Sequence, residues 1–103
     1  MDLEILHINE CPNWEEAGRR VRDSLLAMGR GDKPIRFRLI ESPEDAAKTA
    51  FAGSPTITAD GTDLFPSEGA TSELACRIYY TPSGLAGLPT VDQLIGRIQA
   101  RER

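Results

Sequence analysis

The chain has 103 residues, of which 40% are apolar and 27% are charged, and its formal net charge is -4. A chain of this length folds around one hydrophobic core, so we expect residues 1–103 to form a single domain. The acidic balance argues against a nucleic-acid partner, because binding to phosphates needs a clustered basic surface. No apolar run approaches the roughly 20 residues that span a bilayer, so no membrane partner is expected. Residues 1–4 lack the basic start of a secretory signal, which favours the cytoplasm, where a structural disulfide is unusual.

Two strands are predicted in the first forty residues. Residues 3–8 are nearly continuous in apolar character, which indicates a central strand buried on both of its faces. His7 within this strand is the only histidine, and we interpret it as a structural residue with satisfied hydrogen bonds. Residues 35–39 alternate apolar and basic residues, which predicts an edge strand with one charged face and one buried face, the latter formed by Ile35, Phe37 and Leu39.

A helix is predicted between these two strands, because apolar residues recur there at steps of three and four as far as Met28. Two N-caps are open. Cys11 could cap the helix with Pro12 at the first helical position, where a missing N–H costs nothing. Alternatively Asn13 could be the cap, with Glu16 three residues later completing a capping box.

A short second helix and a hairpin are predicted next. Residues 42–45, Ser-Pro-Glu-Asp, combine an N-cap serine, a proline at the first helical position and acids in the first turn. This helix should end near residues 51–52, with Gly53 as its left-handed stop. Residues 56–59 and 62–65 flank Asp60-Gly61, which predicts two antiparallel strands joined by a two-residue turn.

The last third of the chain is irregular at first and then clearly helical. Proline and glycine interrupt residues 66–89, within which Ser72–Tyr79 could form two turns of helix. Residues 90–93, Thr-Val-Asp-Gln, have the form of a capping box and precede an apolar stripe, so a final helix is expected from that point.

The predicted order is strand, helix, strand, helix, hairpin, helix. A right-handed crossover makes the first two strands parallel neighbours, and the hairpin adds two more, which gives an α/β fold with a four-stranded mixed sheet. This order resembles the minimal thioredoxin-like fold, β-α-β-α-β-β-α, with an inserted segment before the last helix. The resemblance rests on Cys11-Pro12 at the first strand-to-helix junction and on Ser54-Pro55-Thr56 before the third strand. It implies a cis peptide bond at Pro55 and a position for this proline against Cys11.

Three motifs, C-P-N-W, G-S-P-T and C-R-x-Y, are also similar to those of small bacterial thioredoxin-like proteins, some of them labelled alkylmercury lyase-like. The chain departs from the redox members of the family because Trp14 stands where C-x-x-C has its second cysteine. The resolving thiol of the usual dithiol mechanism is therefore missing at that position. Topology places the segment after the hairpin beside Cys11, so this insertion could act as a lid and bring Cys76 to Cys11.

Three functions are consistent with these residues. In the first, Cys11 is the nucleophile of a thiol-disulfide oxidoreductase, and Cys76 or an external thiol resolves the mixed disulfide. A helix N-terminus would favour the Cys11 thiolate, whereas the nearby acids Glu10, Glu15 and Glu16 would oppose it. In the second, the two thiolates bind a soft metal or an organomercurial. In the third, the domain is a non-catalytic binding module.

The expected ligands follow from the first function. The substrate would be a protein or low-molecular-weight thiol or disulfide. Tyr80 is an additional candidate wall of the substrate groove, and Arg77 could favour the thiolate of its neighbour Cys76. We expect no cofactor, and two cysteines with a lone histidine do not make a zinc site of four ligands. The residues predicted to contact substrate are Pro12, Trp14, Ser54, Pro55, Thr56, Arg77 and Tyr79.

Overall fold

A four-stranded mixed sheet forms the centre of the computed structural model, which describes residues 1–66 and 74–102. The strands lie in the order β2-β1-β3-β4, where β1 is Leu3–His7, β2 is Ile35–Leu39, β3 is Thr56–Ala59 and β4 is Thr62–Asp63. β1 pairs in parallel with β2 and antiparallel with β3, and β3 pairs antiparallel with β4. The predicted α/β class with a mixed sheet of four strands is thus confirmed, as are the central position of β1 and the edge position of β2.

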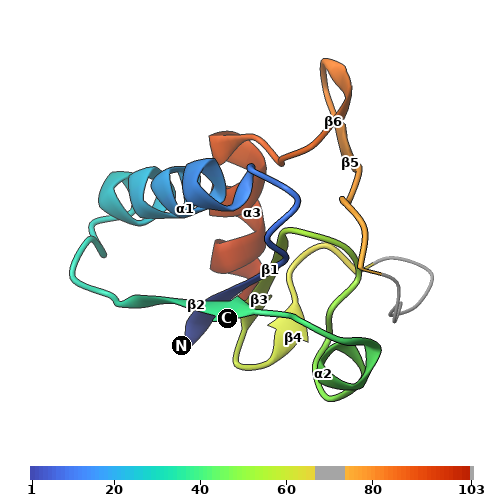
Figure 1. Ribbon diagram of the computed structural model, residues 1–103. Helices are drawn as coiled ribbons and strands as arrows, with labels where there is room; N and C mark the ends of the chain where they lie inside the picture. Colours follow the sequence, from blue (N-terminus) through green and yellow to red (C-terminus); the bar gives the residue numbers. More distant parts are fainter. Residues whose placement is uncertain (67–73, 103) are drawn as a thin grey trace.

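Helices cover both faces of this sheet. α1 (Trp14–Ala27) and α3 (Val91–Arg101) lie on one side, and the short α2 (Pro43–Ala47) lies on the other (Figure 1). Successive residues of a strand face opposite sides, so β1 contributes to two separate apolar clusters. The larger cluster joins its Leu3 and Ile5 to α1 and α3. The second cluster comprises Leu6, Ile8, Cys11, Ile40, Ala46 and Phe51. None of the helices in the described ranges combines the length and the apolar character needed to cross a bilayer.

The elements with strong local signals form as predicted. Asp60 and Gly61 both have positive φ, 52° and 82°, as a tight hairpin turn requires. At the start of α3 the Thr90 hydroxyl accepts from the Gln93 N–H, and the Gln93 side chain accepts from the Thr90 N–H. β4 is shorter than the predicted residues 62–65 because the chain after Asp63 turns inward, where Leu64 and Phe65 are both buried.

The start of α1 agrees with the second of the two caps considered. Asn13 is the N-cap residue, and Cys11 lies two residues before it in the connection from β1. The capping box is absent, because Asn13 makes no side-chain cap bond and Glu16 instead accepts from Arg19 and Arg20. Cys11 therefore has no capping role.

Helix α2 ends earlier than residues 51–52, and the prediction of its length was wrong. Its C-cap is Lys48, and Thr49 lies just beyond it. The Thr49 hydroxyl donates to the Ala46 carbonyl and accepts from the Phe51 N–H. Such local side-chain bonds to the backbone compete with continuation of a helix.

The apolar face of β2 is much less buried than predicted. Phe37 is 47% exposed and Leu39 is 36% exposed. The helices α1 and α3 pack mainly over β1 and β3, so they cover the edge strand β2 only in part. The prediction failed because it assumed that the apolar face of the edge strand would be fully covered.

The helix suggested for Ser72–Tyr79 is also wrong for residues 74–79, which contain no helix. Residues 72 and 73 lie outside the described residues. Tyr79–Thr81 forms β5, which pairs antiparallel with β6 (Gly84–Ala86). Before β5, the backbone around Cys76 forms hydrogen bonds with the distant Ser54 and not with neighbouring residues, as a helix would. The β5–β6 hairpin projects away from the sheet and helices (Figure 1).

Candidate functional site

The two cysteines of the chain form a disulfide between Cys11 and Cys76. Their Cα atoms are 5.9 Å apart although 65 residues separate them in sequence. Cys11 belongs to the connection between β1 and α1, and Cys76 belongs to the segment that precedes β5. The predicted proximity of this segment to Cys11 is thus confirmed. The sequence analysis favoured the cytoplasm, a compartment in which structural disulfides are unusual, so the disulfide itself was not expected there.

Ser54 joins the two segments that carry the cysteines. Its N–H donates to the Ala75 carbonyl at 2.8 Å, and its carbonyl accepts from the Arg77 N–H at 2.9 Å. Its hydroxyl accepts from the Ile8 N–H at 3.0 Å, just beyond the end of β1. Ser54 is fully buried, so these bonds are shielded from water. A single residue therefore holds Cys76 in register with the strand that leads to Cys11.

The next peptide bond, Ser54–Pro55, is cis, as the resemblance implied. Pro55 is buried, and its carbonyl accepts from the Tyr79 hydroxyl. The Thr56 hydroxyl donates to the Gly53 carbonyl and accepts from the Ala52 N–H at 2.9 Å. Ser54, Pro55 and Thr56 therefore form a buried support for the cysteine-bearing segment, with few atoms left for contact with a substrate.

Arg77 anchors the segment from its other side. Its guanidinium donates to both carboxylate oxygens of Asp63, at 3.1 and 3.0 Å, and to the Phe65 carbonyl. It also lies over the Tyr79 ring, 4.6 Å from the centroid. Burial raises the pKa of Asp63, an effect that Arg77 opposes, and burial also raises the pKa of Tyr79. Asp63 balances the charge of Arg77, so Arg77 anchors the segment. The prediction that Arg77 favours a Cys76 thiolate is not supported by these contacts.

The two halves of the disulfide differ in their access to solvent. Cys11 is 0% exposed and packs in the second cluster with Leu6 and Phe51, whereas Cys76 is an exposed residue. Pro12, next to Cys11, is exposed in the turn before α1. The exposed half of the disulfide is therefore Cys76, although sequence reasoning assigned the reactive role to Cys11.

Trp14 packs on the other side of the sheet. Its ring stacks on His7 with centroids 4.6 Å apart and meets Phe37 edge-on at 5.7 Å. His7 is buried, and its Nδ1 has no hydrogen-bond partner within the described residues, so the expectation of a satisfied histidine was wrong for this atom. Burial lowers the pKa of His7. Trp14 therefore lies on the α1 side of the sheet and outside the cluster that holds Cys11, and the predicted contact Tyr79 also packs in the larger cluster on that side.

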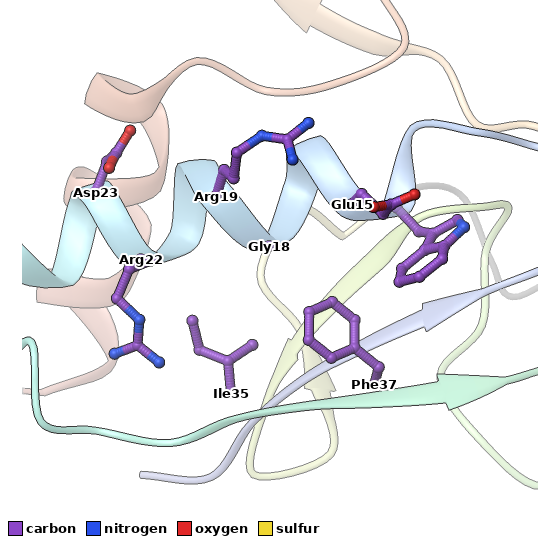
Figure 2. A pocket seen from close by; sticks show the side chains of 8 residues that line it. Glu15, Gly18, Arg19, Arg22, Asp23, Ile35 and Phe37 are labelled. Carbon is purple, nitrogen blue, oxygen red and sulfur yellow. The ribbon is translucent and has the colours of Figure 1, made fainter.

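Trp14 also lines a groove of about 470 Å³ between α1 and β2, which sequence reasoning missed. Figure 2 shows Phe37 and Ile35 rising from β2 toward Gly18, with Arg19 and Arg22 along α1. A Cβ atom at Gly18 would lie 2.7 Å from Cζ of Phe37, so glycine permits this close approach. Two features of the sequence could have indicated this groove: a glycine in the middle of the predicted helix and a phenylalanine in the predicted edge strand.

Within residues 1–66 and 74–102, histidine, cysteine and acidic side chains do not gather in groups of three or more that could hold a metal ion. Both sulfurs are bonded to each other, so neither is a thiolate ligand in this state. Comparison with protein-family models, with curated proteins and with solved structures finds no match to the chain. The functional argument therefore rests on the geometry of the disulfide and its surroundings.

Gly53 provides a test of how tightly the cysteine-bearing segment is held. Its φ is +108°, and a Cβ atom there would lie 2.8 Å from the Arg77 Cβ and 3.0 Å from the Arg77 Cα. We expect Gly53→Ala to lower the free energy of unfolding by about 2 kcal/mol, because backbone strain and overpacking add. Urea unfolding measures this loss. Gly61→Ala is the control, since Gly61 also has positive φ but an added Cβ meets nothing within 4 Å. Equal losses in the two variants would contradict the role of the Arg77 contact.

Proposed function

We propose that the chain is a thiol-disulfide redox protein of the thioredoxin-like class and that the Cys11–Cys76 disulfide is its reactive group. The observation that carries the proposal is the asymmetry of this disulfide, in which a fully buried residue is bonded to an exposed one. The class is supported by the parallel β1–β2 crossover, the antiparallel β3–β4 hairpin, the cysteine after β1 and the cis proline before β3.

The asymmetry assigns different roles to the two sulfurs. A thiolate attacks a disulfide at the sulfur it can reach, which here is that of Cys76. A bond forms between the substrate sulfur and Cys76, the Cys11–Cys76 bond breaks, and the electron pair leaves on Cys11, which takes up the proton that the attacking substrate thiol gave up. A second thiol of the substrate attacks the substrate sulfur of the mixed disulfide and releases Cys76. Two substrate thiols are thereby oxidised to one disulfide, and the protein disulfide is reduced to two thiols.

The same steps run in reverse when the protein is reduced. The Cys76 thiolate attacks a substrate disulfide, and Cys11 resolves the mixed disulfide from inside the second cluster. This exchanges the roles predicted from sequence, where Cys11 was the nucleophile. Cys11 then acts as the resolving thiol, a role that the second cysteine of C-x-x-C has in the redox members and that Trp14, at that position, cannot perform.

Single cysteine variants test both the function and the roles. We expect Cys11→Ala, which leaves Cys76 free, to react with a chromogenic aromatic disulfide at least about tenfold faster than Cys76→Ala, which leaves Cys11 buried. Cys11→Ala should also retain a stable mixed disulfide with glutathione, visible by mass spectrometry. Faster reaction of Cys76→Ala would overturn the assignment of roles.

Catalysis is tested separately with the unmodified chain. The wild-type protein should accelerate exchange between a dithiol peptide and glutathione disulfide, and the double variant Cys11→Ala/Cys76→Ala should not. Circular dichroism confirms that each variant is folded. If wild type and the double variant give the same exchange rate, the proposed redox function is wrong.

A further inference from the structure

The segment that leads from Cys76 into β5 alternates between buried and exposed residues. Arg77 and Tyr79 point into the body of the protein and are buried. Ile78 is 63% exposed, Tyr80 is 82% exposed, and Cys76 is exposed as well. Alternate residues of an extended chain lie on the same face, so Cys76 and these two apolar residues share one exposed surface.

The β5–β6 hairpin extends this surface. Tyr80 is paired across the hairpin with Leu85, which is 65% exposed. Directly opposed residues of an antiparallel pair lie on the same face. Ile78, Tyr80 and Leu85 therefore form one apolar strip that begins beside Cys76 and ends on the β5–β6 hairpin.

A hollow adjoins the strip. It has a volume of about 430 Å³, and Ile78 and Tyr80 are among its walls, together with Gln93 and Arg97 of α3. Phe65 and Tyr79 meet edge-on within the same lining, with ring centroids 5.4 Å apart. The strip is therefore bordered by a concave surface that combines aromatic rings with the polar side chains of Arg77, Gln93 and Arg97.

We propose that the apolar strip docks a polypeptide that carries a cysteine, with the substrate thiol at Cys76 and apolar substrate side chains on Ile78, Tyr80 and Leu85. The proposal rests on the proposed function, because the reactive sulfur at one end of the strip selects a thiol or disulfide as its occupant. From Cys76 to Tyr80 an extended chain covers about 13 Å. A small thiol that reaches the sulfur leaves most of this surface uncovered, whereas an extended peptide covers it. Adjacent exposed apolar side chains are typical of such interaction surfaces.

The test compares how fast different thiols reduce the wild-type disulfide. The probes are dithiothreitol, a peptide with a cysteine between leucine and phenylalanine residues, and a matched peptide with serine in their place. With wild type, we expect the apolar peptide to react at least about tenfold faster than the serine peptide. The variant Tyr80→Ser/Leu85→Ser should lose this preference while its rate with dithiothreitol is unchanged. Leu26→Ser is the control, because Leu26 is another exposed apolar residue (59%), lies on α1 away from the strip, and its loss should change no rate.

The outcomes separate the two proposals. Equal rates for the two peptides, or a preference that survives Tyr80→Ser/Leu85→Ser, would overturn docking on the strip, while reduction through Cys76 would still support the redox function. A disulfide that no probe reduces in the folded protein would overturn both. Sedimentation velocity adds a further outcome: a wild-type dimer that becomes monomeric in Tyr80→Ser/Leu85→Ser would assign the strip to a second copy of the chain and overturn the peptide assignment.

Discussion

Replacing Cys11 and Cys76 together with alanine is expected to lower the free energy of unfolding by about 4 kcal/mol. The disulfide joins residues 65 apart in sequence, and a cross-link over a loop of that size removes much conformational freedom from the unfolded chain. A small domain is stable by only about 5–15 kcal/mol in total, so this is a large share. Urea unfolding followed by circular dichroism measures the loss. Alanine is preferred to serine at Cys11, because a hydroxyl in that apolar cluster would be buried without a partner.

The reduced wild-type protein separates the cross-link from local packing. Reduction removes the bond but leaves both sulfur atoms in place, whereas the double alanine variant also removes sulfur from the second cluster. We expect reduction to account for most of the loss. If oxidised and reduced wild type unfold at the same urea concentration, the cross-link does not restrict the unfolded state as argued.

Arg77→Met is expected to cost about 3–5 kcal/mol, because it leaves the Asp63 carboxylate buried without its charge partner. The side chains of Arg77 and Asp63 are only 7% and 11% exposed, so water cannot replace the lost bonds. Methionine retains much of the apolar stem of arginine, which limits the loss of packing. The effect should appear as a lower midpoint of urea unfolding at neutral pH.

The pH dependence identifies the buried charge as the cause. Burial already raises the pKa of Asp63, and loss of Arg77 removes an opposing effect, so the folded pKa rises further above the unfolded value. Stability of Arg77→Met should therefore fall as pH rises from about 4, the unfolded pKa of aspartate, through the folded pKa. Asp63→Asn/Arg77→Met is the control, because asparagine keeps an acceptor for the Phe65 N–H without the charge. Equal stability of the single and double variants at neutral pH would contradict this account.

Features that depend on neighbouring residues were predictable from the sequence. The turn at Asp60-Gly61 and the capping box at Thr90 each require particular side chains within a few positions, and both form. The continuous apolar character of β1 indicated the central strand, and the crossover rule then made β2 its parallel neighbour. From this topology alone, the sequence placed the segment that carries Cys76 beside Cys11.

The positions that were predicted wrongly depend on contacts between distant parts of the chain. Phe37 alternates like a buried strand residue, but α1 and α3 pack over β1 and β3 and leave the edge strand half covered. The segment around Cys76 has helix-compatible residues, yet its backbone bonds go to Ser54.

The sequence by itself therefore determined the order of the central elements, the parallel pairing of β1 with β2, and the proximity of the segment that carries Cys76 to Cys11, because these follow from local patterns and chain connectivity. Only the tertiary structure decided that Cys11 is enclosed while Cys76 faces solvent, and that Arg77 turns toward Asp63. The physical reason is that solvent access and charge pairing depend on which surfaces pack together, and residues far apart in sequence supply those surfaces.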